Sequence, residues 1–402
     1  MGGKLLLRGM VEVIGLSVGC RKPKQGSEQL KLNHQPCMED FPMGRFTTAK
    51  TRITRSSAIG KQILSRKPKF AGIDFHKKFS VITLGDESGN VVGGPEKLFN
   101  NEHDVRKFFL RHGPLICAIE NCRGNEWFVE TVKACGSEVR VANTFAVRLI
   151  ADSAKKNDKI DSKILMELVS RNYLPVCYQP TRNERILREK LRWRTRLMKS
   201  RTQFKNVGHA VMDKENKGAQ LRSGLQRDWL AENNGLSKER REQLQDCLEV
   251  IDFFEERMDN SDRALVQIAK ENPDVQRLKT IPGVGDISAL MLFAELGDIT
   301  RFKSARHVAG YIGLVPRLYA SSDTRRLGPI TKRGPGRLRW ILVQDAWMAV
   351  KNSEAFRKRY NKILKRRGKK PAIVAIARCI AEIAYHILKN KTEFDENKMT
   401  LG

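Results

Sequence analysis

The chain has 402 residues, enough for about two or three domains, and its 40% hydrophobic and 30% charged residues are typical of a globular protein. Its 75 Lys and Arg exceed its 45 Asp and Glu, and the formal charge of +30 favours a polyanionic partner, nucleic acid above all, over a merely solvated basic surface. The longest apolar stretch, 371–388, contains two charges and so excludes a membrane span, and the eight scattered cysteines form neither a zinc motif nor a disulfide framework, as expected of a reduced cytoplasmic protein.

Residues 1–69 contain 14 Lys or Arg and 4 Asp or Glu without steady periodicity, so we expect a flexible basic extension or a stretch upstream of the true start. From residue 70 the pattern predicts three strands, then a helix, a strand, a helix, a strand and further helix. Their ranges are 69–75, 79–85, 91–99, 101–112, 115–121, 126–134, 138–144 and 145 onward. Three hairpin-connected strands followed by alternating helices and strands predict a ribonuclease-H-like α/β domain over 70–180.

Two helical regions are expected after this domain. Over 181–270 apolar residues recur at helical spacing among Arg and Lys, which predicts two long, coiled-coil-like amphipathic helices that form core or mediate self-association. Over 271–402 the pattern predicts a third, mostly α-helical domain. It opens with LKTIPGVGDISALMLFAELG and closes with the helix PAIVAIARCIAEIAYHIL.

Four carboxylates of the predicted α/β domain are expected to lie close together, two at strand ends and two on one helix. Asp74 ends the first strand and Glu120 the fourth, and these two strands are neighbours in a ribonuclease-H-like sheet. Asp158 and Asp161 are three residues apart, so they share one face of a helix that can present them to the same point. Because four converging carboxylates repel one another unless hard divalent cations bind them, the set predicts a site for Mg²⁺ or Mn²⁺.

Such a site points to phosphoryl transfer on nucleic acid. Two ions about 3.5–4 Å apart stabilise the attacking and leaving oxygens of an in-line displacement, while the basic surroundings hold the polyanionic substrate. For each carboxylate by itself a turn or a helix cap is the commoner role, and only the ordered set favours a metal site. His76, two residues beyond Asp74, is expected at the surface or beside the substrate rather than as a ligand.

The segment IPGVG, together with the helix that follows it, looks like a helix–hairpin–helix element. Gly283 and Gly285 permit a tight turn, and the helix N-terminus beyond them exposes backbone N–H groups that suit a phosphate. A plain connection between two helices explains this short pattern equally well, so both interpretations stay open.

Paired serines, Ser321 and Ser322, are expected in a loop ahead of a run of cations. The cations are Arg325, Arg326, Lys332, Arg333, Arg337 and Arg339. Neighbouring guanidinium groups would activate a serine hydroxyl as a nucleophile and stabilise charge that develops on a phosphate. In the simpler interpretation, which the chemistry alone favours, the segment only cradles a DNA or RNA backbone and the serines hydrogen-bond to phosphates.

Together these motifs resemble those of a known family. The segments GIDFHKK, AIEN, NDKIDSK, IPGVG, GYIGLVPR and GPITKRG with the later LRW are similar to the insertion-sequence transposases called IS one-ten, the bridge-RNA-guided DNA recombinases. The similarity runs from about residue 70 to residue 389. The first 69 residues lie outside it.

The resemblance implies a RuvC-type amino-terminal domain whose Asp-Glu-Asp-Asp tetrad is Asp74, Glu120, Asp158 and Asp161. It also implies a catalytic serine in the carboxy-terminal domain, which corresponds to Ser321. This serine would attack a DNA phosphate to form a phosphoserine link, and the metal-bound tetrad of a neighbouring subunit would assist. The chain departs from the family where a serine replaces the glycine that usually follows, so the resemblance favours Ser321 and leaves its neighbour as the alternative nucleophile.

The partners that the resemblance implies are the DNA of the element ends and target, and a structured guide RNA that pairs with both. Further copies of the chain would form a dimer or tetramer joined by the middle helices. Two alternatives remain at this stage. One is a junction-resolving endonuclease in which the tetrad hydrolyses DNA and the serine segment only binds. The other is a non-enzymatic nucleic-acid binder, against which the four intact carboxylates argue.

Overall fold

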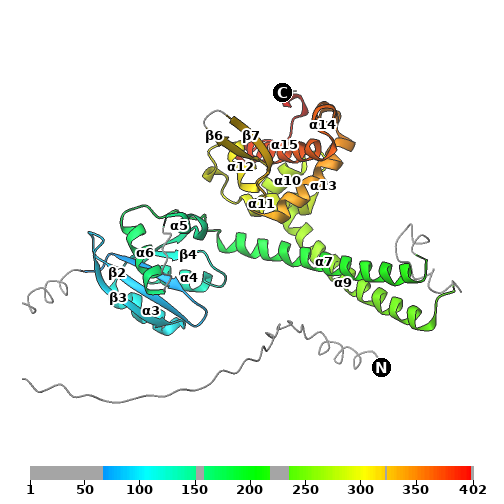
Figure 1. The fold of residues 1–402 in the computed structure, drawn as a ribbon. Helices are drawn as coiled ribbons and strands as arrows, with labels where there is room; N and C mark the ends of the chain where they lie inside the picture. The colour runs from blue at the N-terminus through cyan, green and yellow to red at the C-terminus, as the bar shows by residue number, and fades with distance from the viewer. Residues whose placement is uncertain (1–66, 151–157, 218–234, 322–323, 400–402) are drawn as a thin grey trace, which may run out of the picture. The chain divides into compact units, whose positions relative to one another are not determined.

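The computed structural model describes residues 67–150, 158–217, 235–321 and 324–399 (Figure 1). Of the predicted basic extension, only residues 67–69 fall within these ranges. The described chain opens with a five-stranded mixed sheet and its helices, and continues as a mostly helical region that contains one two-stranded ribbon.

The strands of the mixed sheet are β1 (Phe70–Phe75), β2 (Phe79–Gly85), β3 (Val91–Phe99), β4 (Ile116–Glu120) and β5 (Glu138–Ala142). They stand in the order β3-β2-β1-β4-β5. The pairs β1–β2 and β2–β3 are antiparallel, whereas β1–β4 and β4–β5 are parallel. This order and these directions agree with the ribonuclease-H-like domain expected from the sequence, and each predicted strand is found within two residues of its range.

The helices of this part are α3 (Glu102–His112), α4 (Glu126–Ala134), α5 (Thr144–Ile150) and α6 (Asp158–Ser170). Because successive side chains of a strand point to opposite faces, β1 supplies both cores of the sheet. Ile73 packs with Phe109 of α3 and Phe128 of α4 on one face. Phe70 packs with Met166 of α6 on the other face, so α6 alone of the longer helices covers that side.

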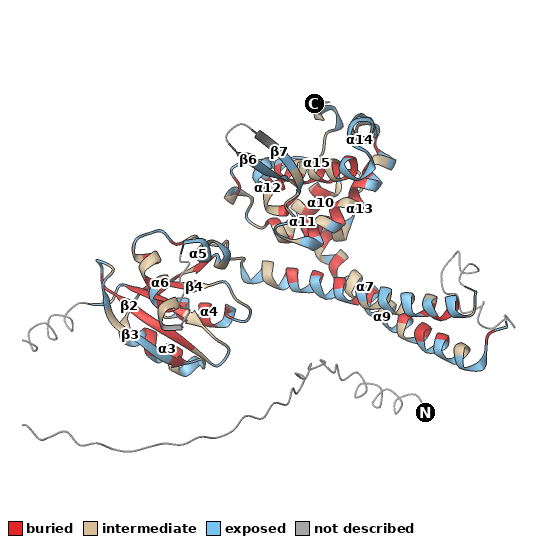
Figure 2. Ribbon diagram, viewed as in Figure 1, coloured by how far each residue is buried: buried red, intermediate tan, exposed pale blue. Residues whose placement is uncertain are grey.

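The chain continues with two long helices, α7 (Arg182–Lys214) and α9 (Lys238–Glu271). Ion pairs show that the two helices run antiparallel. Arg194 Nη2 bonds to Asp262 at 2.9 Å, and Lys205 Nζ, later in α7, bonds to Glu255, earlier in α9, at 3.0 Å. Figure 2 shows buried residues on the facing sides of this pair. The two long amphipathic helices predicted from the spacing are thus present.

The carboxy-terminal region is mostly helical, as predicted. Its helices are α10 (Pro273–Lys279), α11 (Asp286–Leu296), η2 (Ile299–Arg301), α12 (Ala305–Ile312), α13 (Gly336–Asn352), α14 (Glu354–Arg367), α15 (Lys369–Asn390) and η3 (Glu396–Lys398). The sequence analysis missed an antiparallel ribbon, formed by β6 (Pro316–Ser321) and β7 (Thr324–Ile330). Gly328 and Pro329 disfavour a strand locally, and only pairing with β6 stabilises one there.

The two charges in residues 371–388 led us to exclude a membrane span, and the structure corrects that exclusion at helix α15. Among the described residues it is the one helix long and apolar enough to cross a membrane, with a mean hydropathy of 1.5 in its best window, so its two charges were too weak an argument. However, 61% of that window is buried within the protein, where Ile376, Ile380 and Tyr385 join the main core. The burial is that of a central core helix.

Candidate active site

Asp74 and Glu120 lie side by side at the carboxyl ends of two paired strands. The parallel register of β1 and β4 joins Ile73 to Ile119, and the two acids are the next residues along each strand. Residues level with one another in a parallel pair point to the same face. Both acids therefore belong to the face that α6 covers, as the sequence predicted for neighbouring strands.

Helix α6 packs directly on the backbone of β1. A Cβ built on Gly72 would overlap the backbone of α6 at Ser162 and lie 2.9 Å from the Cβ of Met166. A buried hydrogen bond of 2.8 Å joins the hydroxyls of Ser162 and Thr83 of β2. Because Ser162 lies over Gly72, the preceding turn of α6, which begins at Asp158, points toward the carboxyl end of β1.

The helical spacing extends this relation to the second aspartate. Asp161 precedes Leu165 and Val169 in steps of four, and both of these are buried against the sheet. Asp161 itself is half-buried. The side chain of Asp158 lies outside the described residues, and only its place as the first residue of α6 is defined.

Cys122, two residues after Glu120, lies near three acidic side chains. Burial and the nearby charges of Glu120, Glu126 and Asp74 raise the pKa of Cys122 to about 11. Asp74 has an 18% exposed side chain, and its Oδ2 lies 3.1 Å from Nε2 of His76, which is 37% exposed. His76 thus lies beside the proposed ligand and is partly open to solvent, as expected of a surface residue.

The chemistry of this donor set suits a hard divalent cation, since all four predicted ligands are carboxylates. Within the described ranges, no three side chains of His, Cys, Asp or Glu are close enough to hold a metal ion together. Among the described side chains, the strand pair therefore brings together two of the predicted ligands, Asp74 and Glu120.

The predicted serine nucleophile lies on the β6–β7 ribbon. Ser321 is the last residue of β6 and pairs with Thr324, so it stands at a strand end and not in a plain loop. The side chain of Ser321 and the whole of Ser322 lie outside the described residues. The ribbon itself is open to solvent, because Tyr319 and Leu327 are 55% and 60% exposed.

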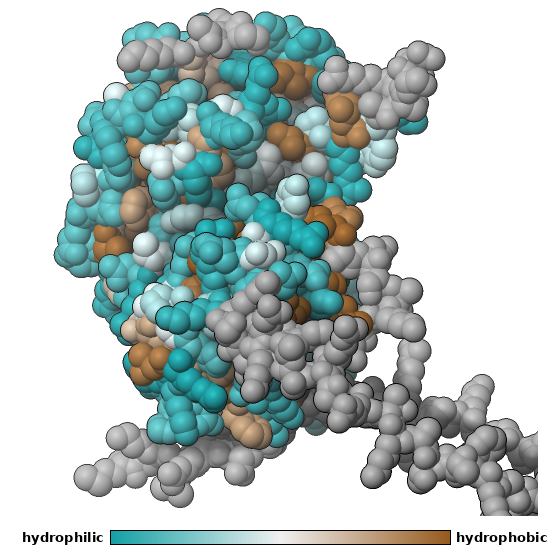
Figure 3. Space-filling view, turned by 90° about the vertical axis from the view of Figure 1, so that its left-hand side faces the viewer, coloured by the Kyte–Doolittle hydropathy of each residue, from teal (hydrophilic) through white to brown (hydrophobic). Residues whose placement is uncertain are grey.

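The predicted nucleic-acid-binding cations fall into two groups. Four are exposed on the ribbon and before or at the start of α13: Arg326, Lys332, Arg333 and Arg337. Arg339 differs, because its Nη1 donates to the carbonyls of Ile312 and Arg333 at 2.7 and 2.8 Å and thereby fixes the loop before α13. The side chain of Arg325 lies outside the described residues. On the face drawn in Figure 3 hydrophilic side chains predominate, as suits a chain of charge +30.

The IPGVG turn connects α10 to α11, and its two glycines have different surroundings. Gly283 has a φ of +87°, and a Cβ there would clash with backbone of α13 at Asp345, so it serves packing. Gly285 is the N-cap of α11 and has open space beside it. In the first turn of α11, Asp286 is paired with Lys279 at 2.6 Å, and its charge competes with a phosphate at this end.

Sequence reasoning missed a buried acid beside this turn. Asp345 of α13 is 4% exposed and accepts a hydrogen bond of 2.7 Å from Ser288 of α11. Burial raises the pKa of Asp345 to about 7, although the bond from Ser288 acts in the opposite direction. The sequence signal that could have revealed the Asp345–Ser288 pair is a single Asp among the apolar residues of α13.

Two family models match the chain. A DEDD-type transposase model of IS110 elements matches residues 71–216, a range that contains all four carboxylates. The model described as "Transposase IS116/IS110/IS902 family" matches residues 275–361, which contain the IPGVG turn, Ser321 and the basic cluster.

Two transposases match over nearly all of their length, and a gene-inverting protein matches over a part of it. The transposase for insertion sequence element IS1111A of Coxiella burnetii is 29% identical over 358 residues, 85% of this chain and 96% of that protein. The transposase for insertion sequence element IS1328 of Yersinia enterocolitica is 27% identical over 333 residues, 81% of this chain and 98% of the relative. The pilin gene-inverting protein of Moraxella bovis is 31% identical over 122 residues, 30% of this chain and 38% of that protein.

Proposed function

Since this chain belongs to the IS110 (IS one-ten) family of transposases, and is thus an enzyme that acts on DNA, we propose that it cuts and rejoins the ends of an insertion sequence at its carboxylate cluster. The observation that carries this proposal is the adjacency of Asp74 and Glu120 on paired parallel strands, with the first turn of α6 directed toward the same edge. In this proposal residues 70–180 form the RuvC-like catalytic domain, 181–270 the oligomerisation helices and 271–402 the serine-bearing domain.

We assign the tetrad as the ligands of Mg²⁺ or Mn²⁺. DEDD-type transposases in general imply a divalent metal, and such cations, when bound, would stabilise the charge on the scissile phosphate and on the attacking and leaving oxygens. The protein's part is to hold its carboxylates at one edge. The close contact of Gly72 with α6 and the hydrogen bond between Thr83 and Ser162 fix the helix for that purpose.

Ser321 is the proposed nucleophile. Its Oγ forms a bond to a DNA phosphorus as the bond from that phosphorus to the departing strand's oxygen breaks, and the serine proton passes through water or a carboxylate to that oxygen, which leaves as a hydroxyl. The hydroxyl of an incoming strand then attacks the phosphoserine and releases the serine. The exposed guanidinium of Arg326, on the same ribbon, would stabilise the negative charge on the phosphoryl oxygens of the pentacoordinate transition state.

A covalent-adduct assay tests this function. The full chain is incubated with Mg²⁺ and a labelled duplex that carries an element end, and denaturing gels then separate free from protein-linked DNA. We expect an adduct with the wild type and with Ser322→Ala, and none with Ser321→Ala. Free cleaved ends in all three proteins would instead establish the junction-resolving endonuclease, in which the tetrad hydrolyses DNA by itself.

Two partners belong to the same proposal. A structured guide RNA would pair with donor and target strands, and its test is sequencing of the RNA that co-purifies with the full chain; the absence of a discrete species would overturn the guided mechanism. Helices α7 and α9 would join copies of the chain as a coiled coil into a dimer or tetramer, and sedimentation equilibrium measures that number. A monomer that still forms the serine adduct would contradict this assembly.

The α10–α11 connection is proposed as a helix–hairpin–helix contact to a DNA phosphate through the open N-terminus of α11 at Gly285. Gly285→Val would then weaken duplex binding without a loss of folding, and unchanged binding would leave this turn as a plain helix connection. We place the activity in the bacterial cytoplasm, in agreement with the six unpaired cysteines among the described residues.

A further inference from the structure

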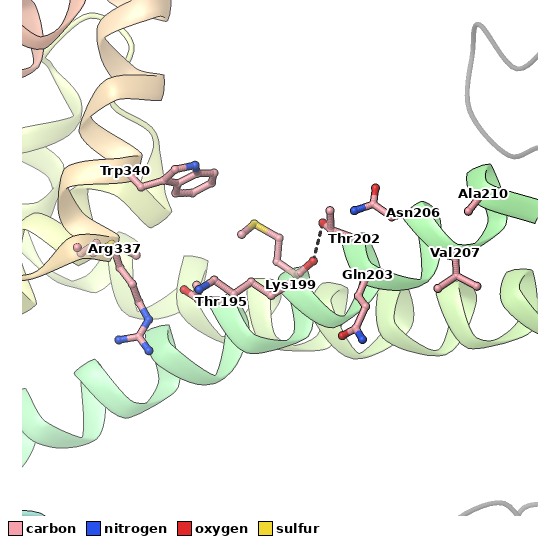
Figure 4. A pocket seen from close by; sticks show the side chains of 12 residues that line it. Thr195, Lys199, Thr202, Gln203, Asn206, Val207, Ala210, Arg337 and Trp340 are labelled. Carbon is pink, nitrogen blue, oxygen red and sulfur yellow. Dashed lines mark hydrogen bonds between the residues drawn. The ribbon is translucent and has the colours of Figure 1, made fainter. Parts of the chain in front are cut away.

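A groove of about 800 Å³ separates helix α7 from the first turns of α13 (Figure 4). On one side it is lined by Met198, Lys199 and Gln203 of α7, and on the other by Arg337 and Trp340 of α13. In Figure 4 the indole of Trp340 projects from α13 toward the groove, and Lys199 extends along α7 toward the end where Arg337 lies. Of its lining residues, only Arg337 belongs to the predicted nucleic-acid-binding cations, and none belongs to the carboxylate tetrad.

Helix α7, which forms one wall of the groove, is fixed to the protein core by contacts about two turns before the groove. Arg188 of α7 is 9% exposed, and its Nε donates to the carbonyl of Ala294 in α11 at 2.7 Å. Leu191, one turn later, joins the same core as Leu338 of α13. The groove is therefore built into the packing of the protein.

The α7 wall of the groove mixes apolar and polar side chains, and its two threonine hydroxyls are not free to bind a ligand. The hydroxyls of Thr195 and Thr202 donate to carbonyls of their own helix, at 2.8 and 2.9 Å, so they are already satisfied. Opposite them, Trp340 is 47% exposed. Because the indole is this exposed, it contributes less hydrophobic stabilisation than a buried indole would. A planar ligand that stacked on the ring would bury it and add that stabilisation to binding.

The charges of the groove indicate what that ligand is. Its charged lining residues are Lys199 and Arg337, both cationic, and none of the lining residues is acidic. A flat apolar ring beside paired cations is the arrangement that binds single-stranded nucleic acid, where a base stacks on the ring and phosphates pair with the cations. Duplex bases are already covered by their neighbours and have no free face for the ring.

We propose that this groove binds an unpaired stretch of a DNA strand, with one base stacked on Trp340 and its phosphates paired with Lys199 and Arg337. The occupant is DNA because the family acts on DNA, and because α13 begins six residues after the end of β7, the strand that pairs with the strand of Ser321. The inference rests on the proposed pairing of a guide RNA with donor and target strands, which leaves stretches of DNA unpaired, but it does not depend on which serine reacts.

The test measures the affinity of the full chain for a fluorescein-labelled single-stranded DNA by fluorescence anisotropy. EDTA is present so that no cleavage occurs. Salt is set at about 0.2 M to weaken sequence-independent phosphate contacts elsewhere on the basic surface. We expect Trp340→Ala to weaken binding by about 5- to 150-fold, and Trp340→Phe to retain most of it. Lys199→Ala would lower the dependence of affinity on salt by about one released ion.

Trp193 of α7 provides the matched control, because it is 55% exposed and does not line the groove. Trp193→Ala should bind the strand as the wild type does. Equal loss in the two tryptophan variants would refute the groove, and so would preferential binding of an RNA of the same sequence. A change of oligomeric state in Trp340→Ala, measured by sedimentation velocity, would show that a second copy occupies the groove instead. Because Ser321→Ala should bind DNA normally here, failure of the serine mechanism is distinguishable from failure of this inference.

Discussion

Gly72 is the position where one methyl group tests the geometry of the active site. It lies in β1 under helix α6, two residues before Asp74. A Cβ there would overlap the carbonyl oxygen of Ser162 and lie 2.9 Å from the Cβ of Met166. These atoms belong to the body of α6, so no rotation of a flexible side chain relieves the overlap. We therefore expect Gly72→Ala to push α6 away from the sheet by ~1 Å.

The structure sets the size of the effect. Overpacking of this kind costs about 1–3 kcal/mol, and stretching the hydrogen bond between Thr83 and Ser162, now 2.8 Å, adds about 0.5–1.5 kcal/mol. The expected loss of stability is thus about 2–4 kcal/mol. Because α6 carries Asp158 and Asp161, the same movement misplaces both relative to Asp74, and a misplacement of ~1 Å costs about 100-fold in rate.

The assay combines thermal unfolding, followed by circular dichroism, with the rate of strand cleavage in Mg²⁺. Gly310→Ala is the matched control, since a Cβ there meets nothing within 4 Å and a helical alanine is neutral or slightly stabilising. We expect Gly72→Ala to melt at lower temperature and to cleave far more slowly even where it is folded. Wild-type melting and cleavage in Gly72→Ala would refute the packing of α6 on β1.

Two further predictions concern the helical region. Burial raises the pKa of Asp345 from 3.8 to about 7. As the pH rises, the Asp345 carboxyl therefore loses its proton at a lower pH in the unfolded chain than in the folded one. Stability should fall between pH 4 and 7, and Asp345→Asn, which can still accept from Ser288, should stabilise by up to about 4 kcal/mol at pH 8 but not at pH 4 in melting experiments. Equal gains at both pH values would contradict this. Arg188→Met leaves the carbonyl of Ala294 unpaired and should lower the free energy of unfolding in urea by about 1–3 kcal/mol; an unchanged midpoint would show that water replaces the guanidinium.

The sheet and its two strand carboxylates could be predicted because they depend on local pattern and on simple pairing rules. Apolar runs bounded by turn residues marked each strand. Once β1 and β4 are parallel neighbours, Asp74 and Glu120 at their carboxyl ends have to be adjacent. The long helices α7 and α9 followed in the same way from apolar residues at helical spacing.

The remaining features depend on contacts between distant segments and therefore leave little trace in the sequence. The β6–β7 ribbon contains Gly328 and Pro329, and only cross-strand pairing makes it a strand. The groove depends on how α7 meets α13, and the exposure of Trp340 shows only after folding, although the segment LRW was noticed. A tryptophan directly after Arg339 was the available signal for a nucleic-acid contact.

The central claim is that carboxylates of the sheet and of α6 share divalent metal ions, and calorimetric titration of Mn²⁺ tests it most directly. The proteins to compare are the wild type, Asp74→Asn, Asp161→Asn and the control Glu138→Gln, in which the changed residue stands at the amino end of β5 and away from the proposed site. We predict that Asp74→Asn and Asp161→Asn each lose most of the Mn²⁺ binding that the wild type and the control retain. Undiminished binding by Asp161→Asn would contradict a site shared between sheet and helix.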